Sequence, residues 1–175
     1  MIPILTTGPT PGAQQRVIYL PIVATPPADP VEPVAIFLNL LTSDRRQERP
    51  ALALCPALVT AATWRAQGMA TGDDPFAHVD ATGLTPNEYA RQAGCRLPVG
   101  YAGKGNNVES LGAGTADAAV MFAALANSPA HADHLFGRGW FAHQTHVGIA
   151  VAQGGVYGWY WVILIAACQR VTSGE

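Results

Sequence analysis

The chain has 175 residues, of which 49% are hydrophobic and 13% charged, with a formal net charge of −2 at pH 7. This length predicts a single domain that can bury a sizeable core. The small negative charge and the lack of a lysine/arginine cluster argue against a nucleic-acid partner. No apolar run approaches the roughly 18 residues that a membrane span needs, so we expect no transmembrane helix.

The cysteines and the N-terminus leave the cellular compartment open. Cys55, Cys95 and Cys168 are an odd number with no pair at metal-ligand spacing. One disulfide with one free thiol and three buried reduced cysteines are equally consistent with that count. No positive charge precedes Arg16 and the apolar run after it is short, so the sequence itself predicts no signal peptide.

Residues 1–33 form an N-terminal extension rich in proline, threonine and glycine. Within it, residues 16–24 have strand composition. Because proline lacks the N–H that a strand ladder needs, Pro21 places them on a sheet edge or in isolation. Residues 25–33 are typical of a stiff linker. Two interpretations stay open: a tail that packs on the domain or is disordered, and an arm that pairs with the sheet edge of a neighbouring molecule.

Local patterns predict three helices in the first half of the chain. Apolar residues at helical spacing indicate an amphipathic helix over residues 34–46. Pro56 suits the first turn of a second helix that runs to about residue 70. Residues 85–88 (TPNE) are a capping box for a short helix that ends at Gly94. Before that box, a Gly-Asp-Asp-Pro run breaks the chain and places His78 in a loop.

The next stretch is predicted to be a loop followed by a broken helix. Residues 95–114 are rich in glycine and indicate a loop that carries Glu109. Thr115 suits the N-cap of an alanine-rich helix, and Ser128 caps the turn that presents His131.

A hairpin is predicted at the end of the chain, where strands over residues 145–153 and 156–166 flank Gly154 and Gly155. Strand alternation puts Trp159 and Trp161 on one face of this hairpin. Helices followed by a hairpin predict an α+β fold with helices packed on a small antiparallel sheet.

Four fragments, taken in order, carry a family resemblance. They are residues 75–83 (PFAHVDATG), 106–110 (NNVES), 127–135 (NSPAHADHL) and 145–149 (THVGI). The set resembles the CAP superfamily of cysteine-rich secretory, antigen-five and pathogenesis-related proteins, and most closely its bacterial secreted, SCP-like branch. The resemblance extends over roughly residues 34–166.

This resemblance implies a three-layer α-β-α sandwich and an extracellular or cell-surface protein. The domain would span residues 34–168, with a short tail at 169–175. It also implies that His78, Glu109 and His131 converge in a surface cleft. Two imidazoles and a carboxylate are suitable ligands for zinc or another divalent ion, with water in an open coordination position. The same side chains are also suitable as an acid/base pair for hydrolysis.

The chain departs from the family pattern around this cleft. Glu109 lacks the preceding Gly and the following Asn of the usual segment. No second Glu precedes His131, and Ala132 replaces the arginine that often follows it. His134, three residues after His131, could approach the same cleft as a further ligand, although packing is the commoner role.

Three functions are consistent with these features. The first is an extracellular binding module for a protein, peptide or lipid ligand, whose cleft holds a divalent metal. The second is a metal-assisted hydrolase that uses the same residues, with Glu109 as base; no complete catalytic constellation is visible, so enzymatic activity stays undecided. The third is a structural subunit of a filament, virion or surface layer, which assembles through the N-terminal arm of residues 1–33, with self-association through residues 16–24.

Overall fold

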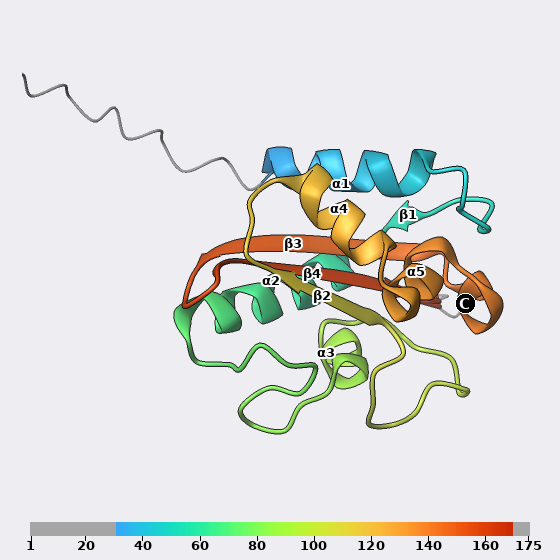
Figure 1. The fold of residues 1–175 in the computed structure, drawn as a ribbon. Helices are drawn as coiled ribbons and strands as arrows, with labels where there is room; N and C mark the ends of the chain where they lie inside the picture. The colour runs from blue at the N-terminus through green and yellow to red at the C-terminus, as the bar shows by residue number, and fades with distance from the viewer. Residues whose placement is uncertain (1–30, 170–175) are drawn as a thin grey trace, which may run out of the picture.

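The computed structural model describes residues 31–169 (Figure 1). The predictions for residues 16–24 and for residues 170–175 therefore lie outside the described residues. The elements are α1 (Val31–Ser43), β1 (Ala53–Leu54), α2 (Pro56–Thr71), α3 (Pro86–Gln92), β2 (Glu109–Ala113), α4 (Ala118–Ala126), α5 (Pro129–Phe136), the 3-10 helix η1 (Gly139–His143), β3 (His146–Gly154) and β4 (Gly158–Ala166). None of the helices within residues 31–169 combines the length and apolarity that a membrane crossing requires.

The four strands form one sheet in the order β1-β3-β4-β2. β3 and β4 are the predicted hairpin, paired antiparallel from His146↔Ala166 to Gly154↔Gly158. β2 adds antiparallel to the other side of β4. The two residues of β1 run parallel to β3, so the sheet is mixed rather than purely antiparallel as predicted.

Helices cover both faces of this sheet, which confirms the predicted three-layer α+β architecture (Figure 1). On one face, α1, α4 and α5 pack a core that includes Phe37, Phe136 and Trp161. On the other, α2 and α3 pack a second core that includes Leu58 and Tyr160. Trp161 and Tyr160 are neighbours in β4 and point to opposite cores, as the alternation of strand side chains requires.

The helix α2 lies directly against β3. A Cβ on Gly148 would come within 2.2 Å of the backbone of Leu58, and one on Gly154 within 2.3 Å of the Ala70 carbonyl oxygen. Glycine at these two positions lets the backbones of helix and strand approach closely. α2 therefore lies along β3 from one end to the other.

The predictions for residues 109–113 and for the N-cap at Thr115 were wrong. Residues 109–113 are not loop but the strand β2, because they pair with β4 some 50 residues later, starting at Glu109↔Leu164. Asp117, not Thr115, caps α4: its Oδ1 accepts from Ala119 N at 2.8 Å and Val120 N at 3.0 Å. The capping box was correct, since Glu88 Oε2 accepts from the N–H of Thr85 at 2.9 Å and α3 begins at the next residue.

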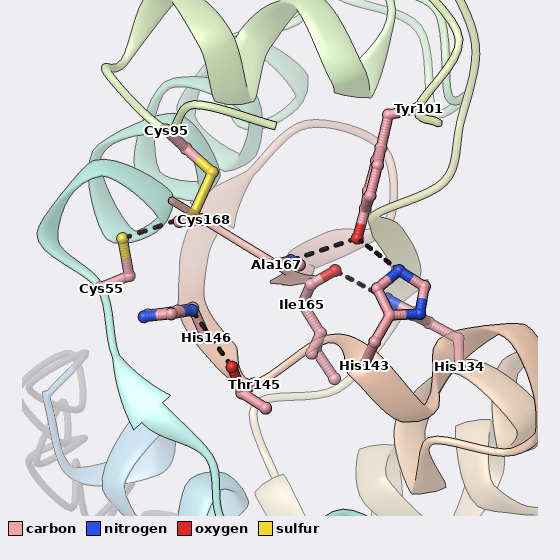
Figure 2. The surroundings of a disulfide bond; sticks show 10 residues. All are labelled: Cys55, Cys95, Tyr101, His134, His143, Thr145, His146, Ile165, Ala167 and Cys168. Atoms are coloured by element: carbon pink, nitrogen blue, oxygen red, sulfur yellow. Dashed lines mark hydrogen bonds between the residues drawn. A yellow bond between two sulfur atoms is a disulfide. The ribbon is translucent and has the colours of Figure 1, made fainter. Parts of the chain in front are cut away.

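The cysteines form one disulfide and leave one free thiol. Cys95, after α3, is bonded to Cys168, after β4, and so ties the α3 layer to the end of the sheet (Figure 2). Cys55, immediately before α2, is the free cysteine, and its Sγ lies 3.7 Å from that of Cys168. Of the two interpretations of the odd count, the first is the correct one.

Candidate functional site

The fold brings His78, Glu109 and His131 to the wall of one pocket of about 140 Å³. His78 comes from the loop after α2, Glu109 is the first residue of β2, and His131 lies in the first turn of α5. Asn106 and His134 line the same pocket. Three distant segments of the sequence therefore meet at one end of β2.

Glu109 is the buried carboxylate of this site, with only 5% of its surface exposed. Its Oε1 lies 2.9 Å from Nδ1 of His78, and its Oε2 lies 3.5 Å from Nε of the fully buried Arg65. A buried carboxylate is tolerated where a cation balances its charge. Arg65 supplies that charge from α2, and it also faces Asp74 Oδ2 at 3.4 Å.

His78 is oriented by Glu109. Since a carboxylate only accepts hydrogen bonds, Nδ1–H of His78 donates to Oε1, and Nε2 is the ring nitrogen that this bond leaves free. The Asn106 side chain braces this arrangement: its amide nitrogen lies 3.0 Å from Nδ1 of His78 and donates to the Glu109 carbonyl at 3.1 Å, and its Oδ1 accepts from Glu109 N at 2.9 Å. The His78 side chain is 44% exposed, so its outer edge is accessible to a ligand.

Asp80 holds the loop that carries His78. Its Oδ1 accepts from Thr82 N at 2.8 Å and from Leu84 N at 2.7 Å, and its Oδ2 accepts from the Tyr89 hydroxyl at 2.6 Å. Burial raises the pKa of Asp80, but these hydrogen bonds favour the charged form more strongly and lower it to about 2. The Asp of the sequence fragment around His78 is thus a loop anchor.

His131 faces His78 from the start of α5. Its Nδ1 lies 2.9 Å from Ser128 Oγ. Ser128 was predicted to cap the backbone of this helix, but it makes no side-chain cap and binds the ring of His131 instead. Burial and the nearby His78 lower the pKa of His131, so its neutral form is favoured. In the tautomer in which Nδ1–H donates to Ser128 Oγ, the lone pair of the ring is on Nε2.

His134 is part of the wall and has both ring nitrogens engaged inside the protein. Nε2–H donates to the Ile165 carbonyl at 3.4 Å, and Nδ1 accepts from the Ser110 hydroxyl at 2.8 Å. Burial lowers the pKa of His134 to about 3. Its ring packs edge-on against Phe141, with 5.2 Å between centroids. The two remaining histidines, His143 and His146, do not line this pocket; in Figure 2 His143 lies beside Tyr101 and His146 beside Thr145.

Sequence reasoning missed Arg65 and Asn106 as site residues. The signal for Arg65 was present, because it follows Leu58 and Ala62 on the apolar face of α2 and an arginine there requires a buried acidic partner. Asn106 lies in the fragment at residues 106–110, but nothing in that fragment indicated that its side chain would brace Glu109.

The donors in this cleft differ from the three-ligand set that the resemblance implies. Between residues 31 and 169, no group of three or more His, Cys, Asp and Glu side chains is arranged to hold a metal ion. Glu109 is engaged by His78 and Arg65. Within the same residues, Nε2 of His78 and Nε2 of His131 make no hydrogen bond, so these two atoms are the donors left for a ligand.

Two solved structures resemble the chain over most of its length. An extracellular protein containing an SCP domain from Bacillus anthracis superposes with a TM-score of 0.60 at 19% identity, covering 78% of this chain and 41% of that one. An outer surface protein from Borrelia burgdorferi gives 0.61 at 18% identity, covering 79% and 94%. The chain thus spans about two fifths of the Bacillus protein. Neither a family model nor a curated protein sequence matches it.

Proposed function

We propose that this chain, whose fold is that of an SCP domain, is an extracellular binding module that holds its ligand between His78 and His131. One observation carries the proposal: both rings are fixed through Nδ1, by Glu109 at 2.9 Å and by Ser128 at 2.9 Å. Each ring therefore keeps Nε2 for a ligand. Such preorganised polar groups bind without a large cost of ordering side chains.

An extracellular location is supported by two independent features. The proteins with the same fold are described as extracellular and as an outer surface protein. The Cys95–Cys168 disulfide is of a kind that persists in oxidising compartments.

The pocket is suited to a small polar group rather than to a whole organic ligand. At about 140 Å³ it is well below the roughly 300 Å³ at which pockets for small molecules begin. It can take an ion with its waters, or the polar end of a larger ligand that lies across the surface. The two imidazoles would bind either of these groups.

A divalent ion such as zinc is the simplest ligand for two neutral imidazoles. Zinc would be held by Nε2 of His78 and Nε2 of His131, and water or a ligand group would complete its coordination. Glu109 would act as the hydrogen-bond partner that orients His78, a role that carboxylates often take behind metal-bound histidines. With two protein ligands, binding should be weaker than in a three-ligand site.

Calorimetric titration of chelator-treated full-length chain with zinc tests this proposal. We expect one site per chain, lost in His78→Ala/His131→Ala and retained in His143→Ala, which removes an exposed histidine outside the pocket. Equal zinc binding by the parent and the double variant would contradict the proposal.

Hydrolysis is the second candidate function, favoured by the Glu109–His78 pair. A histidine oriented by a buried carboxylate is a suitable general base. Nε2 of His78 would take a proton from a water in the pocket, and Glu109 would stabilise the resulting imidazolium. Loss of ester or peptide turnover in a folded Glu109→Gln variant would support this function, whereas unchanged turnover would remove Glu109 from it.

A further inference from the structure

A second, larger groove of about 740 Å³ lies along β3, at the edge of the sheet opposite to β2. One wall is α1, with Val34 and Leu38, and the other is α2, with Val59 and Ala66. Its floor is the outer edge of β3 over residues 149–153. Most of the lining side chains are apolar. Exposing apolar surface to water is unfavourable in free energy, and a chain segment bound in the groove would remove that surface from water.

The edge of β3 along this groove presents backbone groups that can pair with a strand. β1 covers only His146 and Val147, and among residues 31–169 no strand pairs with the outer side of residues 148–154. In the β1 pairing, the Val147 carbonyl accepts from Cys55 N at 2.9 Å. Since peptide groups alternate along a strand, Ile149, Val151 and Gln153 direct theirs to the same outer side.

The groove has the shape of a place for one further strand. Ile149 and Val151 belong to the core on the α1 side, and Ala150 belongs to the core on the α2 side. All three also line the groove, so it reaches around both faces of the β3 edge. The two helix layers extend past this edge, and a strand added there would be covered on both faces.

We propose that residues 17–24 of the same chain bind in this groove as a further strand beside β3. Their sequence, VIYLPIVA, is apolar at odd and even positions alike. Such a run is typical of a strand buried on both faces, which this groove requires. Eight extended residues span about 26 Å, enough to follow β3 from residue 148 to residue 154.

The connection to α1 sets the direction of this strand. α1 begins toward the end of the sheet that carries the β3–β4 turn, and β1 lies at the opposite end (Figure 1). Six residues, 25–30, join the segment to α1 and reach at most about 23 Å. The shortest connection places Ala24 at the β3–β4 end, so the segment runs parallel to β3, as β1 does.

Pro21 fixes which side of the segment faces β3. Because proline has no N–H, its peptide group must point away from the ladder. Ile18, Leu20 and Ile22 then direct their peptide groups toward β3. Pro21 on the new outer edge also hinders the addition of another strand, which favours closure within one molecule over chain-to-chain growth.

Amide hydrogen exchange by NMR on the full-length chain tests the proposal. We expect the amides of Ile149, Val151 and Gln153 to exchange at least about tenfold more slowly in the parent than in Leu20→Asp/Ile22→Asp. Ala150 and Ala152, whose amides face β4, should exchange equally in both and so report an intact sheet. Gln14→Asp/Gln15→Asp, which adds the same charge outside the segment, should behave as the parent.

Equal exchange at the three outward amides in the parent and in Leu20→Asp/Ile22→Asp would overturn the proposal. Protection that rises with protein concentration, together with a dimer mass in light scattering, would place the segment in a second molecule and would also overturn it.

Methyl contacts give a second measurement that needs no variant. Nuclear Overhauser effects from Leu20 or Ile22 to Leu38 or Val59 support the proposal, and their absence from the parent contradicts it.

Discussion

Nδ1 of His78 lies 2.9 Å from Oε1 of Glu109, on the side of the carboxylate away from Arg65. The carboxylate therefore links an exposed histidine to a buried cation. This relationship explains how a side chain in a loop can keep one orientation toward the pocket. It also makes Glu109 an orienting residue, whose removal should affect both stability and binding.

We predict that Glu109→Gln destabilises the fold by about 3 kcal/mol, because it removes the carboxylate beside Nε of the buried Arg65 and leaves that cation with Asp74, at 3.4 Å, as its acidic partner. Zinc affinity should fall by about tenfold, since the ring of His78 loses its fixed orientation. Urea denaturation and calorimetry measure the two effects. The matched control is Glu48→Gln, which removes an exposed partner of Arg138 at 3.7 Å and should change stability by less than about 0.5 kcal/mol. A change in Glu109→Gln as small as in the control would contradict the assigned role.

The buried His134 should make the protein sensitive to mild acid. Its pKa is about 3 in the folded chain and about 6.5 for a solvent-exposed histidine, so the unfolded chain binds the proton more readily. Stability is therefore fully present above pH 6.5 and declines as the pH falls toward 3. Between pH 7 and pH 4.5, the free energy of unfolding should fall by roughly 2–3 kcal/mol less in His134→Gln than in the parent. Urea denaturation at both pH values measures this difference, and parallel curves for parent and variant would rule out His134 as the cause.

The arrangement of the three sulfur atoms predicts an alternative disulfide. Cys55 Sγ is 3.7 Å from Cys168 Sγ, so a small side-chain movement brings the two within bonding distance. In Cys95→Ser we expect Cys55 and Cys168 to be oxidised to each other, as peptide mapping by mass spectrometry would show. In Cys55→Ser the Cys95–Cys168 bond should remain, and its reduction should cost about 4 kcal/mol for a loop closed by residues 73 apart. Two free thiols in Cys95→Ser under oxidising conditions would contradict the first expectation.

Close packing of α2 on β3 makes Gly148 sensitive to a single methyl group. Gly148→Ala would place a Cβ 2.2 Å from the backbone of Leu58, which cannot move aside as a flexible side chain would. We expect the free energy of unfolding, measured by urea denaturation, to fall by about 1–3 kcal/mol. Gly103→Ala is the control, because nothing lies within 4 Å of a Cβ there. Similar losses in both variants would show that the close contact is not the cause.

Local sequence patterns predicted the elements whose signals are short-range. Pro56 and the capping box at residues 85–88 marked the starts of α2 and α3. The Gly154-Gly155 pair marked the hairpin. β2 was missed because residues 109–113 are defined by pairing with β4, and that partner is distant in sequence. A glycine-rich segment next to such a strand has the local composition of a loop.

The site was predictable only in part for the same reason. His78, Glu109 and His131 are separated by dozens of residues, so spacing alone could not bring them together, and the family resemblance was needed. The contacts that fix their geometry were not predicted from the motifs. Arg65 acts from α2 and Ser128 was assigned to the helix backbone, whereas the structure shows each beside a site residue.

The most direct test of the central claim is ¹⁵N NMR of the imidazole nitrogens during a zinc titration of the full-length chain. Because Nδ1 of His78 and Nδ1 of His131 are held by Glu109 and Ser128, we predict that zinc shifts the Nε2 resonances of both rings and leaves their Nδ1 resonances close to their starting values. The nitrogens of His143 should not respond. Zinc-dependent shifts at Nδ1, or no shift at either ring, would contradict a binding site between His78 and His131.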